Sequence, residues 1–340
     1  MNRVDVLIIG SGVAGTAVAS RVLAHDPTAS VLMLEAGSKV KMRDFSLHQN
    51  YLVTGRLPYQ FCEDAPYPTK DNAGENESWG KTVIPLNGSR LMVYGGSTVH
   101  WGGWSFRFKP EDFRLNSALQ AADVSLQASY DVIDWPIGYE ELEPYYCEAE
   151  HFIGVSGDSA DRTLPRSSGY PFPAFPYTLE DGPAIEAMRS LDIDYGHMPI
   201  ARYGIAASAS GHSPCQTTGT CKYCPFGARF AAANCLDDLL DRGYPNFRVE
   251  RNVIVESLLM QDKQTVAGVR YIDRKQSASD VKELRAGQVV IAAGAIESSK
   301  LLLRSASAEW PQGVGNDNAL VGRNLVTHPY IMFEADLPSN

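Results

Sequence analysis

The chain has 340 residues, of which 44% are hydrophobic and 21% charged; this allows about two domains and excludes both a disordered protein and a small disulfide-stapled one. Its 30 Lys and Arg against 40 Asp and Glu give a net charge of −10, and no basic run offers a surface for a phosphate backbone, so we expect no nucleic-acid partner. No apolar stretch reaches about 18 residues, so we also expect no membrane span.

Residues 1–10 enter a strand-like apolar run directly and carry neither a signal-peptide cleavage site nor a twin-arginine motif. The sequence therefore predicts a cytoplasmic protein, or one exported together with a partner subunit. Residues 4–37 follow a β-α-β pattern, with a strand to Ile9, a glycine-rich turn, a helix to about Leu23 and a strand Ser30–Leu34. This pattern is typical of one parallel unit of a doubly wound sheet.

The turn after the first strand has the spacing G-x-G-x-x-G, in Gly10, Gly12 and Gly15, with Glu35 twenty residues beyond Gly15. Gly10 permits a tight turn, Gly12 lets the backbone approach a pyrophosphate, and Gly15 lets the helix pack on the strand. Glu35 can accept hydrogen bonds from a ribose 2′-hydroxyl, which disfavours a 2′-phosphate. We expect FAD or NAD here and not NADP; the alternative is a glycine-rich turn without a ligand.

A second glycine motif, Gly95–Gly103, begins with Gly95 and Gly96, followed by Ser97, Thr98 and, after one residue, His100. Paired glycines before two hydroxyl residues can offer main-chain N–H groups and hydroxyls to a second point on an extended cofactor. A cofactor that is bound at two points fits FAD better than NAD. The alternative is a flexible turn between strands.

Long irregular stretches separate these motifs from the rest of the sheet. Residues 38–84 are rich in Asn, Asp, Pro and aromatic side chains, and the prolines of residues 158–220 break any regular pattern. Asn246–Met260 and Thr265–Asp273 are expected to be strands, and Gln288–Ala293 a buried strand followed by Gly294 and a helix over Ala295–Leu303.

The expected fold class is therefore α/β, a Rossmann-like FAD-binding domain with an inserted, incomplete α+β substrate domain. We assign 1–40, 85–115 and 230–310 to the FAD-binding domain, and 41–84, 116–229 and 311–340 to the substrate or cap domain.

Several stretches together resemble the N-terminal part of the glucose–methanol–choline (GMC) flavin oxidoreductases, with motifs nearest to bacterial FAD-dependent sugar dehydrogenase large subunits and pyranose oxidase. Besides the two glycine motifs, they are Asp134–Tyr146, Arg251–Val255, Val289–Ser298 and Val321–Leu325. The resemblance implies that Val253 passes the adenine and that Ala293 and Gly294 lie beside the flavin.

The same resemblance implies hydride transfer from a CH–OH group of a sugar or alcohol to FAD. It further implies an external electron acceptor and a small partner subunit or a cytochrome. It gives three alternatives for His100, which precedes Trp101 at the spacing of the pyranose-oxidase branch: a covalent link to the flavin, a contact without a bond, or a histidine packed near the ring as a hydrogen-bond donor.

Three cysteines, Cys215, Cys221 and Cys224, gather within ten residues, with Cys235 eleven further on. The cluster resembles the iron–sulfur loop of FAD-dependent sugar dehydrogenases, in which thiolates hold the cluster. Two alternatives stay open. One is a zinc site with Cys235 as the fourth ligand, and the other is a set of reduced thiols.

No catalytic residue is assigned. The family supplies its proton acceptor from a histidine in the C-terminal third, and nothing in these 340 residues matches that motif. We therefore expect an FAD-dependent GMC-type oxidoreductase whose chain is incomplete here. The alternative is a flavin-binding or electron-transfer subunit without turnover of its own.

Overall fold

The structure, a computed structural model, describes residues 3–40, 76–79, 82–85, 91–124, 132–204, 211, 213–217, 224, 226–275 and 280–325, with 76–79 and 82–85 described by their backbone alone. The strands are β1 (Arg3–Ile9), β2 (Val31–Glu35), β3 (Asn76–Trp79), β4 (Thr82–Pro85), β5 (Ser156–Gly157), β6 (Phe172–Pro173), β7 (Phe247–Arg251), β8 (Val253–Met260), β9 (Val266–Asp273) and β10 (Val281–Ile291). The helices are α1 (Val13–His25), α4 (Leu115–Ala121), α5 (Tyr139–Ile153), α6 (Gly182–Ser190), α7 (Ala232–Asp241) and α8 (Ala295–Arg304), with 3₁₀ turns η3 (Gly96–Val99), η4 (Pro110–Arg114) and η5 (Leu179–Asp181). No helix among the described residues is long and apolar enough to cross a bilayer.

A six-stranded sheet joins segments that are far apart in the sequence, in the order β7-β2-β1-β10-β9-β8. β7, β2, β1 and β10 run parallel to one another, and β10, β9 and β8 form an antiparallel meander. The register places Val6 opposite both Val31 and Gln288. The expected α/β class, with its parallel nucleotide-binding core, is confirmed.

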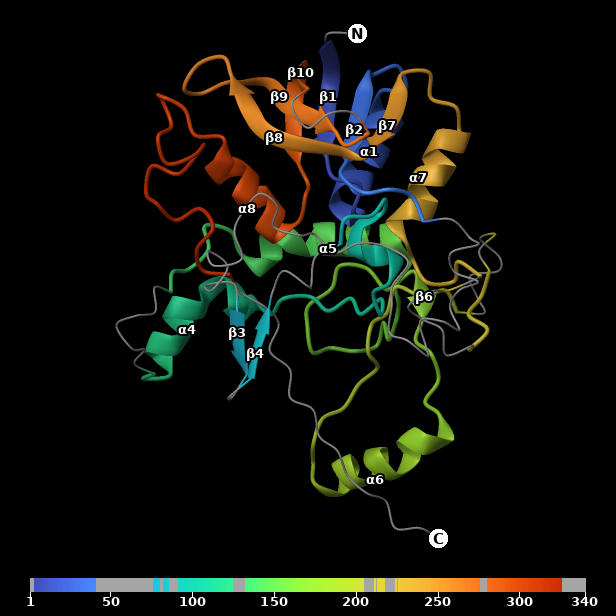
Figure 1. The fold of residues 1–340 in the computed structure, drawn as a ribbon. Helices are drawn as coiled ribbons and strands as arrows, with labels where there is room; N and C mark the ends of the chain where they lie inside the picture. Colours follow the sequence, from blue (N-terminus) through green and yellow to red (C-terminus); the bar gives the residue numbers. More distant parts are fainter. Residues whose placement is uncertain are drawn as a thin grey trace.

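Apolar side chains on the two faces of β1 bury different elements. Val6 and Ile8 pack in one cluster with Leu23 of α1 and Leu236 of α7. Leu7 and Ile9 pack in a second cluster with residues of β8, β9 and α8. Figure 1 shows α7 and α8 on opposite sides of the sheet. Because the second cluster also contains Leu34 of β2 together with Val253, the meander covers the sheet near the carboxyl ends of its strands.

The expected strand Asn246–Met260 is wrong in one respect, because it is two strands in the structure. Asn252 has a left-handed φ of 65° and separates β7 from β8. Its main chain is held there by a hydrogen bond from Asn252 N to the Gly37 carbonyl (3.3 Å) and one from Arg274 N to the Asn252 carbonyl (2.8 Å). Asparagine tolerates this conformation better than most residues. The break lets the chain leave the parallel sheet and begin the meander.

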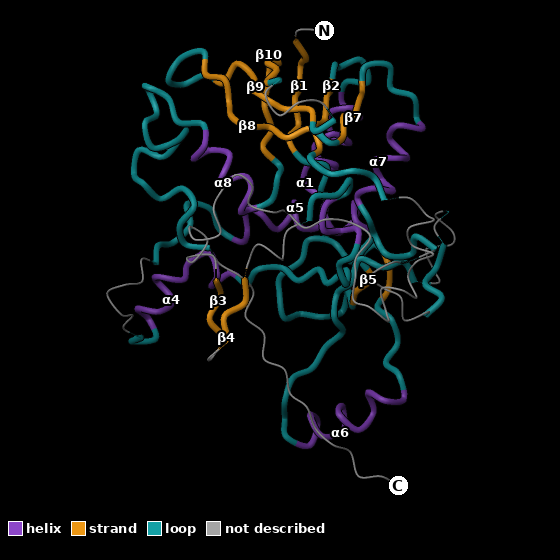
Figure 2. Tube along the Cα trace, in the orientation of Figure 1, coloured by secondary structure: helices purple, strands orange, loops and turns teal. Residues whose placement is uncertain are grey.

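Two other expectations also need correction. Residues 158–220 are not wholly irregular, because α6 forms there with Pro183 in its first turn, where proline is tolerated. The expected buried strand Gln288–Ala293 ends earlier, because the longer β10 stops at Ile291, and Gln288 is exposed. Figure 2 shows that loops dominate the region between α5 and α6.

A buried ionic network fixes α5 to the rest of the fold. The Arg107 guanidinium donates to both oxygens of Glu150 (2.7 and 2.9 Å) and to Glu143 (3.1 Å). A further guanidinium N–H donates to the Tyr139 hydroxyl at 3.0 Å. Burial by itself would raise the pKa of Glu143, but hydrogen bonds from Cys147, Ser167 and Arg107 outweigh it and lower the pKa to about 2. Arg107, Glu143 and Glu150 are each less than a tenth exposed.

This lowered pKa predicts a loss of stability in acid. The contribution of Glu143 is complete above its ordinary pKa of 4.5 and is lost as the pH falls toward about 2, because the unfolded chain then binds a proton that the folded chain does not. We expect the free energy of unfolding to fall across that interval, and to fall less steeply in Glu143→Gln. Urea titrations at a series of pH values measure both slopes, and equal slopes would contradict this reading.

Candidate functional site

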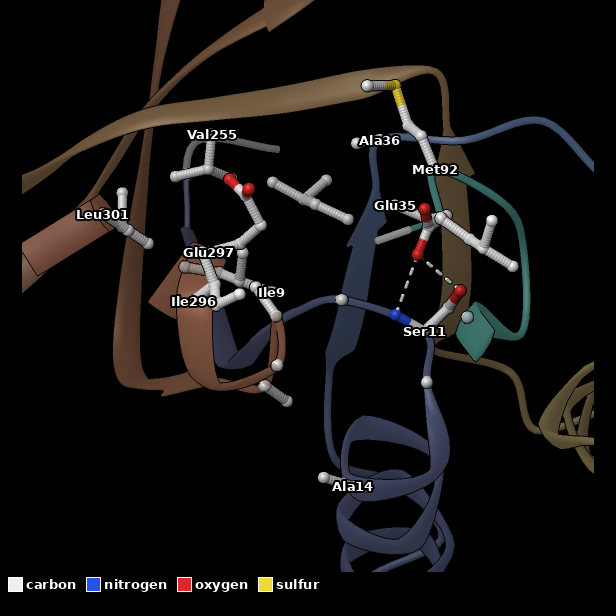
Figure 3. Close-up of a pocket in the computed structure, with 18 of the residues that line it drawn as sticks. Ile9, Ser11, Ala14, Glu35, Ala36, Met92, Val255, Ile296, Glu297 and Leu301 are labelled. Atoms are coloured by element: carbon white, nitrogen blue, oxygen red, sulfur yellow. Dashed lines mark hydrogen bonds between the residues drawn. The ribbon is translucent and has the colours of Figure 1, made fainter. Parts of the chain in front are cut away.

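One cavity of about 520 Å³ opens at the carboxyl ends of the parallel strands, where ligands bind in open α/β sheets. Its walls come from the turn after β1, the end of β2, the start of β8 and the turn from β10 into α8. Of the candidate residues named from the sequence, those that line it are Gly10, Gly12, Glu35, Gly96, Ser97, Val253, Ala293 and Gly294. Figure 3 shows Glu35 and Ser11 on one side of this cavity, and Val255 and Glu297 on the other.

The three glycines of the first motif do different things in the fold. Gly10 has a φ of 99°, and a Cβ there would lie 2.5 Å from the Ala292 carbonyl oxygen. A Cβ at Gly15 would collide with the Gly10 carbonyl, so the absence of a side chain lets α1 meet β1. Gly15 does not line the cavity. Gly12 has nothing within 4 Å of a Cβ and begins α1 without a side-chain cap. The first N–H groups of α1 are therefore accessible to an anion in the cavity.

Glu35 organises the glycine turn from the end of β2. One carboxylate oxygen accepts the Ser11 N–H (3.0 Å) and the Ser11 hydroxyl (2.6 Å), and the other accepts the Gly37 N–H (2.6 Å). Burial raises the pKa of this carboxyl, and the hydrogen bonds from Ser11 and Gly37 oppose that rise. A carboxylate oxygen can accept two hydrogen bonds. The oxygen bonded to Gly37 therefore has capacity left for a ribose hydroxyl.

The second glycine motif lies directly against the first. We call its first five residues, Gly95–Val99, the cradle. A Cβ at Gly96 would be 3.0 Å from the Gly12 Cα, and the Gly95 N–H donates to the Ser11 hydroxyl at 2.9 Å. Gly95 has a φ of 92° and itself lies outside the cavity wall. The two motifs therefore lie side by side at the cavity.

The third part of the wall is the turn from β10 into α8. Gly294 has a φ of 82°, begins α8 without a side-chain cap, and has nothing within 4 Å of a Cβ. The Ala292 N–H bonds the Ile9 carbonyl at 2.8 Å, which keeps this turn beside the turn after β1. Two long helices, α1 and α8, thus begin at the same cavity, each with a glycine open to it.

Histidines take no part in the described wall of the cavity. His100 ends the 3₁₀ turn η3, where its N–H donates to the Ser97 carbonyl at 3.2 Å, and it does not line the cavity. His25, His151 and His197, the other histidines that the structure describes, are also absent from the wall. The geometry therefore assigns no proton acceptor among them.

The cysteines are described in part, because Cys221 lies outside the described residues. The Cys215 Sγ accepts the Thr217 N–H at 3.4 Å and a guanidinium N–H of Arg202 at 3.7 Å. Cys224 is half-buried, with a free thiol. Burial, and after it the charge of Asp238, raises the pKa of Cys235 to about 11. Within the described ranges, no three His, Cys, Asp or Glu side chains converge as a metal site would require.

Ser11 is the residue at this site that the sequence did not single out. Its hydroxyl donates to Glu35 and accepts from Gly95, so it joins the first strand-helix turn, the end of β2 and the cradle. It occupies a variable position of G-x-G-x-x-G, and the spacing gives no signal for it. The hydroxyl between Gly10 and Gly12 is the feature of the sequence that could have indicated this role.

Replacing this serine tests its linking role. Ser11→Ala removes the hydroxyl that accepts the Gly95 N–H and donates to a Glu35 carboxylate oxygen. We therefore expect a loss of about 1–3 kcal/mol in the free energy of unfolding. We also expect FAD affinity to fall about tenfold. Ser156→Ala is the matched control, because the Ser156 hydroxyl is equally buried, donates to the Arg202 carbonyl at 2.6 Å and lies away from the cavity. Equal effects on FAD affinity would contradict the role of Ser11.

Known proteins match this chain along most of its length. Residues 201–330 match the family model described as GMC oxidoreductase. The chain is 28% identical to the fructose dehydrogenase large subunit of Gluconobacter japonicus over 96% of this chain and 59% of that protein. It is 31% identical to paromamine 6′-oxidase of Streptomyces fradiae over 98% of this chain and 56% of that protein. It thus spans less than two thirds of either relative.

Solved structures match the fold. Pyridoxine 4-oxidase from Mesorbium loti superposes with a TM-score of 0.52 at 22% identity, over 89% of this chain and 52% of that one. An FAD-dependent oxidoreductase from Chaetomium thermophilum superposes with a TM-score of 0.54 at 18% identity, over 89% and 47% of the two chains. At these identities the likeness concerns the fold alone.

Proposed function

We propose that this chain, whose residues 201–330 match the GMC oxidoreductase family model, binds FAD in the cavity at the sheet edge. We propose further that the protein oxidises a CH–OH group of a sugar or an alcohol. The named activities of the fructose dehydrogenase subunit and of paromamine 6′-oxidase support this substrate class.

One observation carries the cofactor assignment: Gly12 and Gly294 begin two helices at one cavity, and neither position has an atom within 4 Å of a Cβ. Such open glycines admit a ligand against the backbone. The starts of α1 and α8 would attract the diphosphate, and Glu35 would accept a ribose hydroxyl. Val253 and Leu34 would offer an apolar surface to the adenine. The residues present therefore fit the cofactor.

When bound, FAD supplies a hydride acceptor for alcohol oxidation. The described residues of this chain hold and orient it. Glu35 fixes the turn through Ser11, and the cradle closes the cavity against that turn at Gly12. Ile9, Leu34, Val253 and Val255 give the cavity wall an apolar part, which would favour an isoalloxazine or adenine ring over bulk water.

Anaerobic addition of substrates tests the oxidoreductase assignment. The FAD-loaded chain is mixed with aldoses, ketoses, polyols and primary alcohols, and flavin absorbance is followed without oxygen. Bleaching by one of these classes, and not by the matching deoxy compound, supports CH–OH oxidation and contradicts the expectation that the proton acceptor lies outside these 340 residues. Bleaching by dithionite alone supports a flavin site without turnover of its own in this chain.

We also propose that His100 contacts the flavin, with or without a covalent bond. The position of His100 at the end of η3, directly after the cradle, supports this contact. Acid precipitation of the FAD-loaded protein separates the alternatives. A yellow pellet supports a covalent bond, and a colourless pellet under a yellow supernatant excludes it.

We further propose that Cys215, Cys221 and Cys224 hold an iron–sulfur cluster. The Cys215 sulfur accepts two N–H groups, and hydrogen bonds of this kind surround cluster thiolates. Only part of the ligand set is described, so we derive no electron-transfer step through it. Iron and acid-labile sulfide in anaerobically purified protein support the cluster, and absence of both excludes it.

A further inference from the structure

The cradle has two sides, and only one of them faces the cavity. Gly96, Ser97 and Thr98 line the cavity. The other side lies against residues 228–233, which lead into α7 and which we call the rear wall. A Cβ at Gly95 would be 2.7 Å from the Ala233 nitrogen, so the two segments are in contact without room for a side chain.

Arg229 joins the rear wall to the cradle through its side chain. Its residue is 4% exposed, and its guanidinium donates from Nη1 to the Thr98 carbonyl (2.6 Å) and from Nη2 to the Val99 carbonyl (2.7 Å). The planar fork of an arginine presents parallel N–H groups that match two neighbouring acceptors. Because each peptide group is planar, holding two consecutive carbonyls fixes the orientation of two peptide planes of the cradle.

Three neutral hydrogen bonds accompany the contact of Arg229 with the cradle. The Ala232 N–H donates to the Thr98 hydroxyl at 2.9 Å, and that hydroxyl donates to the Gly95 carbonyl at 2.6 Å. The Trp101 indole N–H donates to the Phe230 carbonyl at 2.8 Å. The guanidinium supplies the one charged contact in this set, and charge-assisted hydrogen bonds are the stronger kind.

The main chain of the rear wall is held by hydrogen bonds to residues 201–203. Arg229 pairs with Arg202 in an antiparallel bridge. The Tyr203 N–H donates to the Ala228 carbonyl (2.6 Å), and the Phe230 N–H donates to the Ala201 carbonyl (3.0 Å). The side chain of Arg229 therefore projects from a fixed base.

We propose that Arg229 is a positioning residue of the cofactor site, whose guanidinium holds the cradle in the orientation that receives FAD. The inference rests on the proposed function, since it concerns the same site. Arg229 is absent from the cavity wall and acts through Thr98 and Val99. The sequence resemblance assigned this residue no role.

Arg229→Lys is the first test, because lysine keeps the charge but offers no fork for two carbonyls. We expect its FAD dissociation constant to rise about tenfold, as for the loss of one charged hydrogen bond. The control is Arg166→Lys, which replaces a similarly buried arginine that donates to Glu150 (2.5 Å) and the Ser168 carbonyl (3.1 Å), away from the cradle. We expect the control to bind FAD within about twofold of the wild type.

A rescue measurement separates positioning from general stability. Arg229→Ala is titrated with FAD in the presence of ethylguanidinium, which matches the deleted atoms, or of ethylammonium at the same ionic strength. Recovery of FAD affinity with the guanidinium salt alone, at an unchanged melting temperature of the FAD-free variant, supports positioning; recovery that only follows a rise in that melting temperature supports a purely structural role.

The outcomes of these titrations are distinguishable. Wild-type binding together with unchanged binding by Arg229→Lys overturns this inference and leaves the proposed function intact. Failure of the wild type to bind FAD overturns the proposed function, and the role of Arg229 with it. If Arg229→Ala does not fold, the lysine variant and its control decide the matter.

Discussion

Gly12→Asp is expected to weaken FAD binding about 100-fold or more, equivalent to about 2.8 kcal/mol, while the stability of the FAD-free protein stays unchanged or rises slightly. Gly12 has a φ of −68°, which any residue adopts, and an added Cβ meets no atom within 4 Å. Aspartate is also a favoured helix N-cap residue, so it should stabilise the start of α1. The same carboxylate occupies the N–H groups of α1 and repels a diphosphate.

Gly182→Asp provides the matched control for this variant. It makes the same charge change at the start of α6, where an added Cβ also meets nothing within 4 Å, and it lies outside the cavity wall. Fluorescence titration with FAD and thermal unfolding of both FAD-free variants give the two quantities needed. If Gly12→Asp and Gly182→Asp bind FAD equally well, the start of α1 does not receive the diphosphate.

Arg107→Met is expected to lower the free energy of unfolding by about 3–5 kcal/mol, because it leaves a buried ionic network without its central cation. Glu143 and Glu150 are 8% and 4% exposed and both accept from this guanidinium. Arg166 still pairs with Glu150 in the variant, so the larger share of the cost falls on Glu143. Urea denaturation near pH 7 measures the loss.

An exposed ion pair on the surface provides the control for this loss of unfolding free energy. Arg270→Met breaks the ion pair with Glu283 (3.0 Å), in which both side chains are about half exposed, and we expect it to cost less than about 1 kcal/mol. The difference between the two variants should shrink as the pH falls toward the pKa of Glu143, because a protonated carboxyl no longer needs the cation. Equal losses at neutral pH would show that burial of this network contributes nothing.

The parallel core could be read from the sequence because its signals are local. Apolar runs, the spacing of Gly10, Gly12 and Gly15, and the helix pattern after Gly294 each depend on neighbours within a few residues. The structure places β1 beside β10, which no local pattern specifies, but the two strand-turn-helix units together imply such pairing.

Features that depend on long-range contacts were missed. The break at Asn252 is held by main-chain bonds to Gly37 and Arg274, and nothing within the strand pattern signals it. The close approach of Gly96 to Gly12 joins motifs more than 80 residues apart. Ser11 and Arg229 act on groups distant in sequence, so residue type and spacing alone could not identify them.

Titration of the purified, reduced chain with FAD is the most direct test of the site. We expect saturable binding of one FAD per chain, weakened about 100-fold or more in Gly12→Asp, retained in Gly182→Asp and not competed by NADP. Absence of binding at saturating FAD, by a wild-type chain shown to be folded, would contradict it. The cavity at the starts of α1 and α8 would then have a different occupant.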